Sequence, residues 1–123
     1  MNDLYLMMGE KQIAHSDSKS AISKFILEDG LKAYEKPDGL FKNKTEITIY
    51  EMMDWASKRV FPKERTDCKK LLDEMGLNDY FPWEIAKQTR ASLIEDKFWI
   101  KFGKGDEYYK DTARGVAESK GLM

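Results

Sequence analysis

Three residues that interrupt helices divide the second half of the chain, and they constrain its fold more than any other feature. Pro62 lacks an amide donor and restricts the residue before it, so a preceding helix ends there. Gly76 suits the position that follows a helix, and Pro82 suits the first position of one. The sequence therefore predicts three helices, over residues 49–60, 64–75 and 82–93.

The first two of these helices have recognisable buried faces. Thr48 and Glu51 form a capping box, in which each side chain can satisfy the other residue's free amide. Apolar residues follow at helical spacing and predict a core-facing stripe of Ile49, Met52, Met53, Ala56 and Val60. On the second helix the same argument gives a stripe of Cys68, Leu71, Leu72 and Met75.

Turn residues predict two hairpins and another helix in the first half of the chain. Gly9 separates two short apolar runs, which predicts a hairpin over residues 4–15. The Pro-Asp-Gly sequence at 37–39 predicts the turn of a second hairpin over residues 31–43. Between them, apolar pairs at i, i+4 spacing predict a helix over residues 18–28.

The remaining pattern completes an α+β fold. Lys97–Phe102 alternates apolar and charged residues and is predicted to be a strand. We expect a single globular domain over residues 1–103, in which small antiparallel hairpins or a sheet pack with about four helices. Gly, Lys and Asp dominate beyond this point, so residues 104–123 are predicted to form a mobile tail.

Composition and charge narrow the functional classes. The 21 basic and 22 acidic residues nearly cancel, which disfavours nucleic acid as a partner. The apolar runs are too short for a membrane span, and the N-terminal residues lack the regions of a signal peptide. The single cysteine excludes an internal disulfide and suits a reducing compartment. We therefore expect a cytoplasmic protein without membrane contact.

The sequence contains no recognisable catalytic or metal-binding set. His15 is the only histidine, and it could serve Cys68 as a base only if a hairpin and a buried helix face met. Structural zinc sites need about four Cys or His ligands, and Gly103-x-Gly105 lacks the surroundings of a phosphate-binding loop. We expect no metal, no cofactor and no enzymatic activity.

An aromatic and basic cluster has two interpretations. Trp55 and Arg59 are separated by one helical turn, so the guanidinium can lie over the indole, and Arg65 and Trp99 could join them. In the structural interpretation the tryptophans belong to the core and the arginines join helices. In the functional interpretation some of these side chains form a binding surface, because Trp, Tyr and Arg are common at interfaces.

The loop before the third helix is the predicted protein-binding site. Tyr80, Phe81 and Trp83 lie where no helical stripe requires burial, and Arg90 lies on the adjoining helix. Exposed apolar groups of this kind often mark a partner site, so these four residues could dock a protein or a second copy of the chain. Core packing of the same aromatic residues is the competing explanation.

One ordered set of positions spans the second half of the chain: Trp55, Arg59, Pro62, Arg65, Leu71-Leu72, Gly76-Leu77, Ser92-Leu93 and Asp96-x-Phe98-Trp99-Ile100. This order resembles the N-terminal segment that precedes the kinase domain in bacterial HipA-like proteins, and it also resembles related short bacterial and phage proteins. The opening segment 4–14 fits the same resemblance. No kinase residue carries over, so the resemblance implies an accessory or recognition module.

Two functions are compatible with these features. The first is a non-enzymatic protein-binding module, encoded by a phage or mobile element and acting as an inhibitor of a host defence factor, of the anti-CRISPR type. The alternative is a helix-turn-helix DNA-binding regulator formed by the helices around Gly76 and Pro82. Lys87 and Arg90 would contact phosphates, but Glu84 and Glu95 accompany them, which disfavours this alternative.

Overall fold

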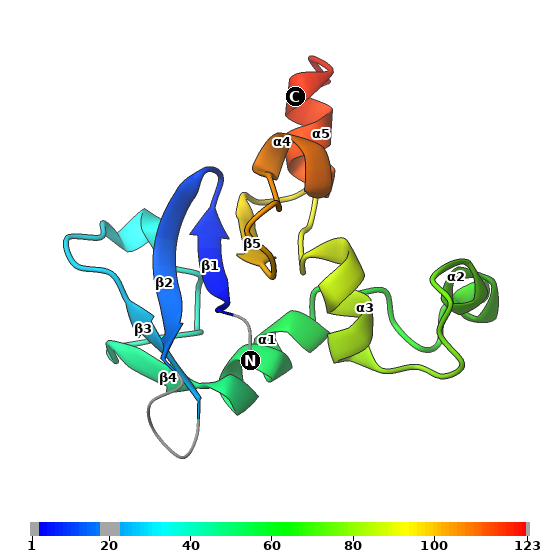
Figure 1. Ribbon diagram of the computed structural model, residues 1–123, viewed down its shortest axis with the longest axis horizontal. Helices are drawn as coiled ribbons and strands as arrows, with labels where there is room; N and C mark the ends of the chain where they lie inside the picture. Colours follow the sequence, from blue (N-terminus) through cyan, green and yellow to red (C-terminus); the bar gives the residue numbers. More distant parts are fainter. Residues whose placement is uncertain (1–2, 18–22, 123) are drawn as a thin grey trace.

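Five antiparallel strands form one sheet in the order β4-β3-β2-β1-β5 (Figure 1). The computed structural model describes residues 3–17 and 23–122. The sheet joins the two halves of the chain, because β1 pairs with β2 on one side and with β5 on the other. The strands are β1 (Tyr5–Met8), β2 (Lys11–Asp17), β3 (Lys24–Leu27), β4 (Glu46–Thr48) and β5 (Phe98–Lys101).

Short helices pack around this sheet, which confirms the predicted α+β class. Across residues 3–17 and 23–122, no helix is both long and apolar enough to cross a membrane. The helices are the 3-10 helix η1 (Ala33–Glu35), α1 (Ile49–Ser57), α2 (Cys68–Glu74), α3 (Pro82–Thr89), α4 (Tyr108–Asp111) and α5 (Ala113–Ser119).

A β-bulge between β1 and β2 explains why two successive residues of β2 are buried. The register shifts between Leu6 and Met7, which leaves Ile13 as the extra residue on β2. Ile13 and Ala14 are both fully buried in the same cluster, whereas a regular strand would send them to opposite faces. The hairpin predicted over residues 4–15 is confirmed.

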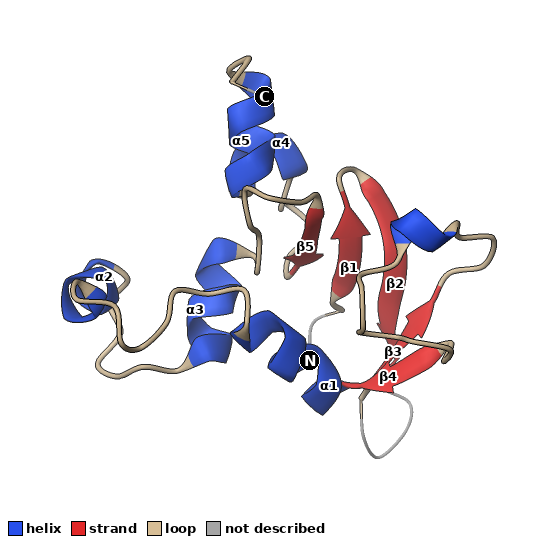
Figure 2. Cartoon of the chain, turned by 180° about the vertical axis from the view of Figure 1, so that it is seen from behind, coloured by secondary structure: helices blue, strands red, loops and turns tan. Residues whose placement is uncertain are grey.

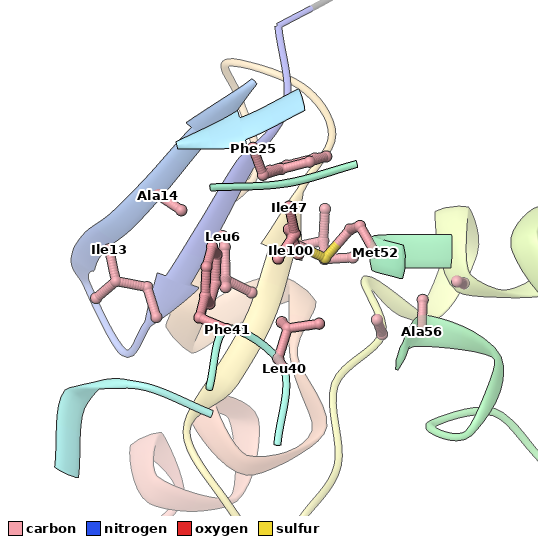
Figure 3. Packing of buried hydrophobic residues seen from close by; sticks show 12 residues of the cluster. Leu6, Ile13, Ala14, Phe25, Leu40, Phe41, Ile47, Met52, Ala56 and Ile100 are labelled. Atoms are coloured by element: carbon pink, nitrogen blue, oxygen red, sulfur yellow. The ribbon is translucent and has the colours of Figure 1, made fainter. Parts of the chain in front are cut away.

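One face of the sheet packs against α1, α3 and the loop before β4 (Figure 3). Removing this apolar surface from water supplies the main driving force for folding. Strand alternation sends Ile100 of β5 to this face and its neighbour Trp99 to the other. The buried members of this core are Leu6, Ile13, Ala14, Phe25, Leu40, Phe41, Ile47, Met52, Ala56, Ala86, Ala91 and Ile100.

Trp99 anchors a smaller cluster on the opposite face of the sheet. Its side chain is buried, and its indole N–H donates a hydrogen bond to the Gly9 carbonyl at 2.7 Å. Met7 and Tyr108 complete the cluster, with the Trp99 and Tyr108 rings 6.5 Å apart. Trp99 is therefore a core residue, as the structural interpretation of the aromatic cluster predicts, and it is not part of an exposed binding surface.

The helix predicted over residues 18–28 is wrong in its described part, because Lys24–Leu27 forms β3. Residues 18–22 lie outside the described residues. Phe25 is fully buried and Ile26 is only partly buried, as the alternation of a strand requires. Pairing with β2 and β4 on both sides therefore overrides the i, i+4 spacing of the apolar residues.

The second hairpin, predicted over residues 31–43, is also wrong. This segment contains η1, and its consecutive residues Leu40 and Phe41 are both buried, whereas neighbours in a strand face opposite sides. Glu35 turns inward and pairs with the ammonium group of Lys11, which lowers the pKa of the Glu35 carboxyl. A buried carboxylate and two apolar anchors hold this segment in place, without strand pairing.

The helix boundaries in the second half follow the predicted signals, although each helix is shorter than expected. The Glu51 amide donates to the Thr48 hydroxyl oxygen at 3.2 Å, and the Thr48 amide donates to the Glu51 carboxylate at 3.3 Å. Pro82 is the first residue of α3, and Gly76 follows α2 with a left-handed φ of 73°. In Figures 1 and 2, α2 projects away from the sheet.

The segment 104–123, which we predicted to be a mobile tail, contains α4 and α5. Thr112 joins the two helices: its hydroxyl accepts a hydrogen bond from the Gly115 amide at 3.0 Å and donates one to the Tyr108 carbonyl at 2.7 Å. A methyl group on Gly115 would lie only 1.9 Å from that same carbonyl oxygen. The close approach of α5 to α4 therefore requires glycine at this position.

We predict that Gly115→Ala separates α5 from α4, because the new methyl group must displace a backbone carbonyl. The opening free energy of residues 108–119 should fall by about 1–3 kcal/mol, a typical cost of overpacking. Hydrogen exchange followed by mass spectrometry measures this loss of protection. Gly105→Ala is the matched control, since nothing lies within 4 Å of the added methyl group. Equal effects of the two substitutions would contradict the prediction.

Candidate functional site

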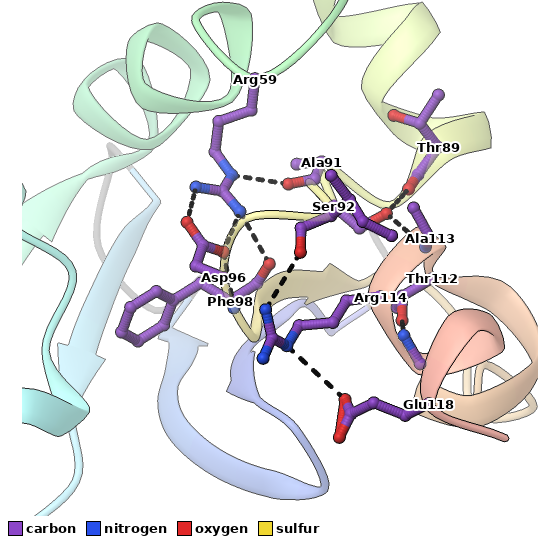
Figure 4. A network of polar contacts seen from close by, with 12 residues as sticks. Arg59, Thr89, Ala91, Ser92, Asp96, Phe98, Thr112, Ala113, Arg114 and Glu118 are labelled. Atoms are coloured by element: carbon purple, nitrogen blue, oxygen red, sulfur yellow. Dashed lines mark hydrogen bonds and ion pairs between the residues drawn. The ribbon is translucent and has the colours of Figure 1, made fainter. Parts of the chain in front are cut away.

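The guanidinium of Arg59 joins the end of α1 to the segment between α3 and β5 (Figure 4). Its two terminal nitrogens donate to the two carboxylate oxygens of Asp96, at 2.9 and 2.6 Å. Its Nε donates to the Ala91 carbonyl at 2.7 Å, and Nη2 also donates to the Phe98 carbonyl at 2.9 Å. Only 8% of this side chain is exposed, so these partners replace the water that the charge loses.

Trp55 covers the same guanidinium. The central carbon of the Arg59 guanidinium lies 4.4 Å from the centroid of the indole ring, in a cation–π contact. The predicted aromatic and basic cluster is thus only partly assembled. Arg65 lies beside Asp67, with 2.6 Å between nitrogen and oxygen, and Trp99 lies on the other face of the sheet.

A groove follows the outer face of α1, and we call it the Trp55 groove. It consists of two adjoining hollows of about 610 and 440 Å³, which share Asp38 and Trp55. One wall comes from α1 and the residue after it, at i, i+1, i+4, i+5 and i+8: Tyr50, Glu51, Asp54, Trp55 and Lys58. The other wall comes from the segment before β4: Tyr34, Lys36, Pro37, Asp38, Gly39, Leu40, Lys42 and Lys44. The smaller hollow is also lined by the ion pair of Arg59 and Asp96 and by Phe98.

Aromatic side chains stand open to solvent on both walls of the Trp55 groove. Tyr34 and Tyr50 are each 67% exposed, and Trp55 is half-buried between the two hollows. Large exposed aromatic groups are unfavourable in water and are common at protein interfaces. The arrangement can therefore offer apolar contact area on both walls of the groove, from α1 and from η1.

Ion pairs hold most of the charged side chains along the α1 wall. The Lys44 ammonium lies 3.1 Å from the Glu51 carboxylate, and the Lys58 ammonium lies 3.3 Å from that of Asp54. The hydrogen bond from the Thr48 amide, followed by the one from Lys44, lowers the pKa of Glu51. These pairs leave the carboxylates of this wall largely compensated.

The loop that we predicted as a binding site has only one strongly exposed aromatic residue. Phe81 is 55% exposed. The Tyr80 hydroxyl donates to the Phe61 carbonyl at 2.6 Å, and burial raises the pKa of that hydroxyl. Trp83 packs against the main core and meets the Phe102 ring edge-on at 5.3 Å.

Arg90, the fourth residue of the predicted site, is engaged with the C-terminal segment. Its guanidinium donates to the Asp106 carboxylate at 3.0 Å. Burial alone would raise the pKa of Asp106, but hydrogen bonds from Arg90 and from the amides of Phe102 and Gly103 outweigh it, so that pKa is lowered. Arg90 thus links the end of α3 to the segment that leads into α4.

Cys68 and His15, the possible nucleophile and its base, do not lie near one another. His15 lies 3.0 Å from the Glu28 carboxylate on the sheet, whereas Cys68 begins α2. β2 and α2 lie at opposite ends of the molecule (Figure 1). Within the part of the chain that the structure describes, no three residues of the His, Cys, Asp or Glu types are grouped to hold a metal ion.

The two helices of the predicted helix-turn-helix are not stacked on one another. α3 packs against α1, and its residues Ile85 and Ala86 are fully buried. On its outer side, Lys87 is paired with Glu84 at 3.1 Å. The C-terminal end of α2 is joined to α3 by a hydrogen bond from the Gln88 side-chain amide to the Met75 carbonyl at 2.9 Å, and the rest of α2 projects outward in Figures 1 and 2.

Comparison with known proteins gives no match: no family model fits the chain, and no curated protein or solved structure is significantly similar to it. The resemblance to the N-terminal segment of HipA-like proteins therefore stays a prediction, and the functional argument depends on the geometry above.

The sequence analysis missed Tyr34 and Tyr50. Tyr50 had a usable signal, because it follows Ile49 of the core stripe by about 100° around the helix and shares a face with Asp54 and Lys58. Tyr34 had none, because its segment was predicted to be a hairpin strand. Its exposure depends on η1, which turns the neighbouring Glu35 inward.

We predict that Arg59→Ala destabilises the fold by about 3 kcal/mol, the lower end of the range for breaking a buried ion pair, because Asp96 is partly exposed. Urea denaturation followed by tryptophan fluorescence measures the loss. Arg65→Ala is the matched control: its pair with Asp67 is exposed, and removing it should cost less than about 1 kcal/mol. Similar losses in both variants would contradict a central role for Arg59.

We predict that Asp106→Asn makes stability less dependent on pH. The folded-state pKa of Asp106 lies below its ordinary value of 3.8, so its charge stabilises the fold above that value and the contribution is lost as the pH falls further. At pH 7 the variant should be about 1.5–3 kcal/mol less stable than the wild type, the value of hydrogen bonds to a charged group. Denaturation at a series of pH values tests this, and a difference that stays constant down to pH 2 would contradict it.

Proposed function

We propose that this protein is a non-enzymatic protein-binding module and that it binds its partner in the Trp55 groove. The observation that carries the proposal is the pair of tyrosines, Tyr34 and Tyr50, each 67% exposed on opposite walls beside Trp55. Aromatic anchors at the centre of an interface supply most of its binding energy. An inhibitor of a host defence factor would need a surface of this kind, since it acts by occupancy and not by chemistry.

The rigidity of the groove supports this proposal. α1 starts at a complete capping box, and Arg59 fixes its other end to the segment beside β5. The Trp55 indole is held against that guanidinium. A preorganised surface binds more tightly, because less conformational freedom is lost when the partner arrives.

Two other surfaces have weaker support. In the loop before α3, Phe81 is the only one of the predicted aromatic residues that is mostly exposed, so it offers a single anchor. The DNA-binding alternative would place α3 in the major groove, where its outer Lys87 is already paired with Glu84.

We predict that Tyr50→Ala strongly weakens partner binding and leaves the fold intact, because its exposed ring contributes to the surface and little to the core. Loss of a hot-spot aromatic residue costs at least about 2 kcal/mol, or roughly thirtyfold in Kd. Pull-down from a bacterial lysate, identification of the retained protein and calorimetry with that purified protein measure the effect. Urea denaturation checks that stability is unchanged.

Phe81→Ala is the matched control, since it removes an exposed aromatic ring from a different surface. If binding survives Tyr50→Ala and is lost in Phe81→Ala, the loop before α3 is the site and the proposal for the Trp55 groove is wrong.

A further inference from the structure

The segment that forms the second wall of the Trp55 groove presents an excess of positive charge. Four lysines lie in residues 32–44, and Glu35, one of its two acids, is turned into the protein to pair with Lys11. The outward acid is Asp38. This wall is therefore basic, although the whole chain has a net charge of -1.

Three of these lysines, Lys32, Lys36 and Lys42, form no ion pair with a carboxylate among the described residues, and the last two line the Trp55 groove. Lys44, by contrast, is paired with Glu51 on the facing wall. An incoming carboxylate can meet Lys36 and Lys42 without breaking an existing pair.

The backbone at Lys42 provides an independent observation. Its φ of 52° is left-handed, in a turn closed by a hydrogen bond from the Lys44 amide to the Phe41 carbonyl at 2.8 Å. A residue with a side chain is strained in this conformation, where glycine is not. A lysine at such a position is unfavourable for the turn itself, and strained residues concentrate at functional sites.

We infer that the Trp55 groove binds an acidic segment of a partner protein, one that carries at least one apolar side chain; this inference rests on the proposed function. The apolar side chain fits against Trp55 and Tyr50, and carboxylates of the segment meet Lys36 and Lys42. Single-stranded nucleic acid fits less well. Its evenly spaced phosphates would also pass Asp38, which forms no ion pair among the described residues, whereas a peptide can place its carboxylates only at the lysines.

The test is selection from a random sixteen-residue peptide library displayed on phage, with the folded wild-type chain as bait and Tyr50→Ala for counter-selection. We expect the enriched peptides to be acidic and to contain an aromatic or aliphatic residue. Enrichment of neutral or basic peptides would overturn this inference and leave the proposed function standing. If no peptide survives counter-selection, both the inference and the proposed function fail.

The most enriched peptide, synthesised with a fluorescent label, then tests the two lysines by anisotropy. The double variant Lys36→Gln/Lys42→Gly should weaken binding by roughly twofold to thirtyfold, the effect of two exposed charge pairs. Its urea midpoint should equal or exceed that of the wild type, because glycine relieves the strained turn. Lys69→Gln on the distant α2 is the matched control and should bind like the wild type.

A binding constant that is unchanged in the double variant would overturn the inference. A labelled dT16 oligonucleotide serves as the second probe. If it binds more tightly than the peptide at the same salt concentration and competes with it, the groove is a nucleic-acid site, and both the inference and the proposed function fail.

Discussion

The buried guanidinium of Arg59 is the interaction on which the rest of this architecture depends. A buried cation is tolerated only when its donors are satisfied, and here four hydrogen bonds and an aromatic face surround it. Two of its acceptors are backbone carbonyls, of Ala91 and Phe98, so the contact fixes main chain as well as side chains. It ties α1 to the strand that pairs with the N-terminal hairpin.

The same contact shapes the candidate site. Because Arg59 and Trp55 are one helical turn apart, the ring that lies over the guanidinium is also the ring that the two hollows share. The core and the groove therefore use opposite sides of one helix: Met52 and Ala56 are fully buried, and Tyr50 is mostly exposed. Under the proposed function, stability and recognition are coupled through α1, so substitution of Arg59 should disturb both, whereas substitution of Tyr50 should disturb recognition alone.

Local signals in the sequence predicted the elements that local interactions determine. The Thr48–Glu51 capping box, the Pro82 helix start and the Gly9 turn each involve residues within a few positions of one another, and all three are present. β3 could not be predicted in this way, because pairing with distant strands selects it over a helix. The α+β class followed from these local elements, but the strand order did not.

The parts of the candidate site that could not be predicted depend on contacts between residues far apart in the chain. Arg59 and Asp96 are 37 positions apart, so local spacing could not reveal their ion pair. The sequence analysis grouped Arg59 with Trp99 instead, but Trp99 lies on the other face of the sheet. Residues 104–123 carry few apolar side chains, yet Tyr108 is buried because Trp99 lies beneath it.

The turn between α3 and β5 completes the argument, because its conformation is unfavourable by itself. Arg90 and Ala91 are both left-handed, with φ of 59° and 52°, and such non-glycine residues cost on the order of 1–2 kcal/mol each. The turn directs the Arg90 carbonyl to the Ile100 amide, at 2.8 Å, and the Ala91 carbonyl to Arg59. The strain is offset by these hydrogen bonds, one of which also satisfies the Ile100 amide of β5. Arg59 therefore stabilises the strained turn. The turn, for its part, supplies the Ala91 carbonyl as an acceptor, and the buried Arg59 guanidinium requires such acceptors.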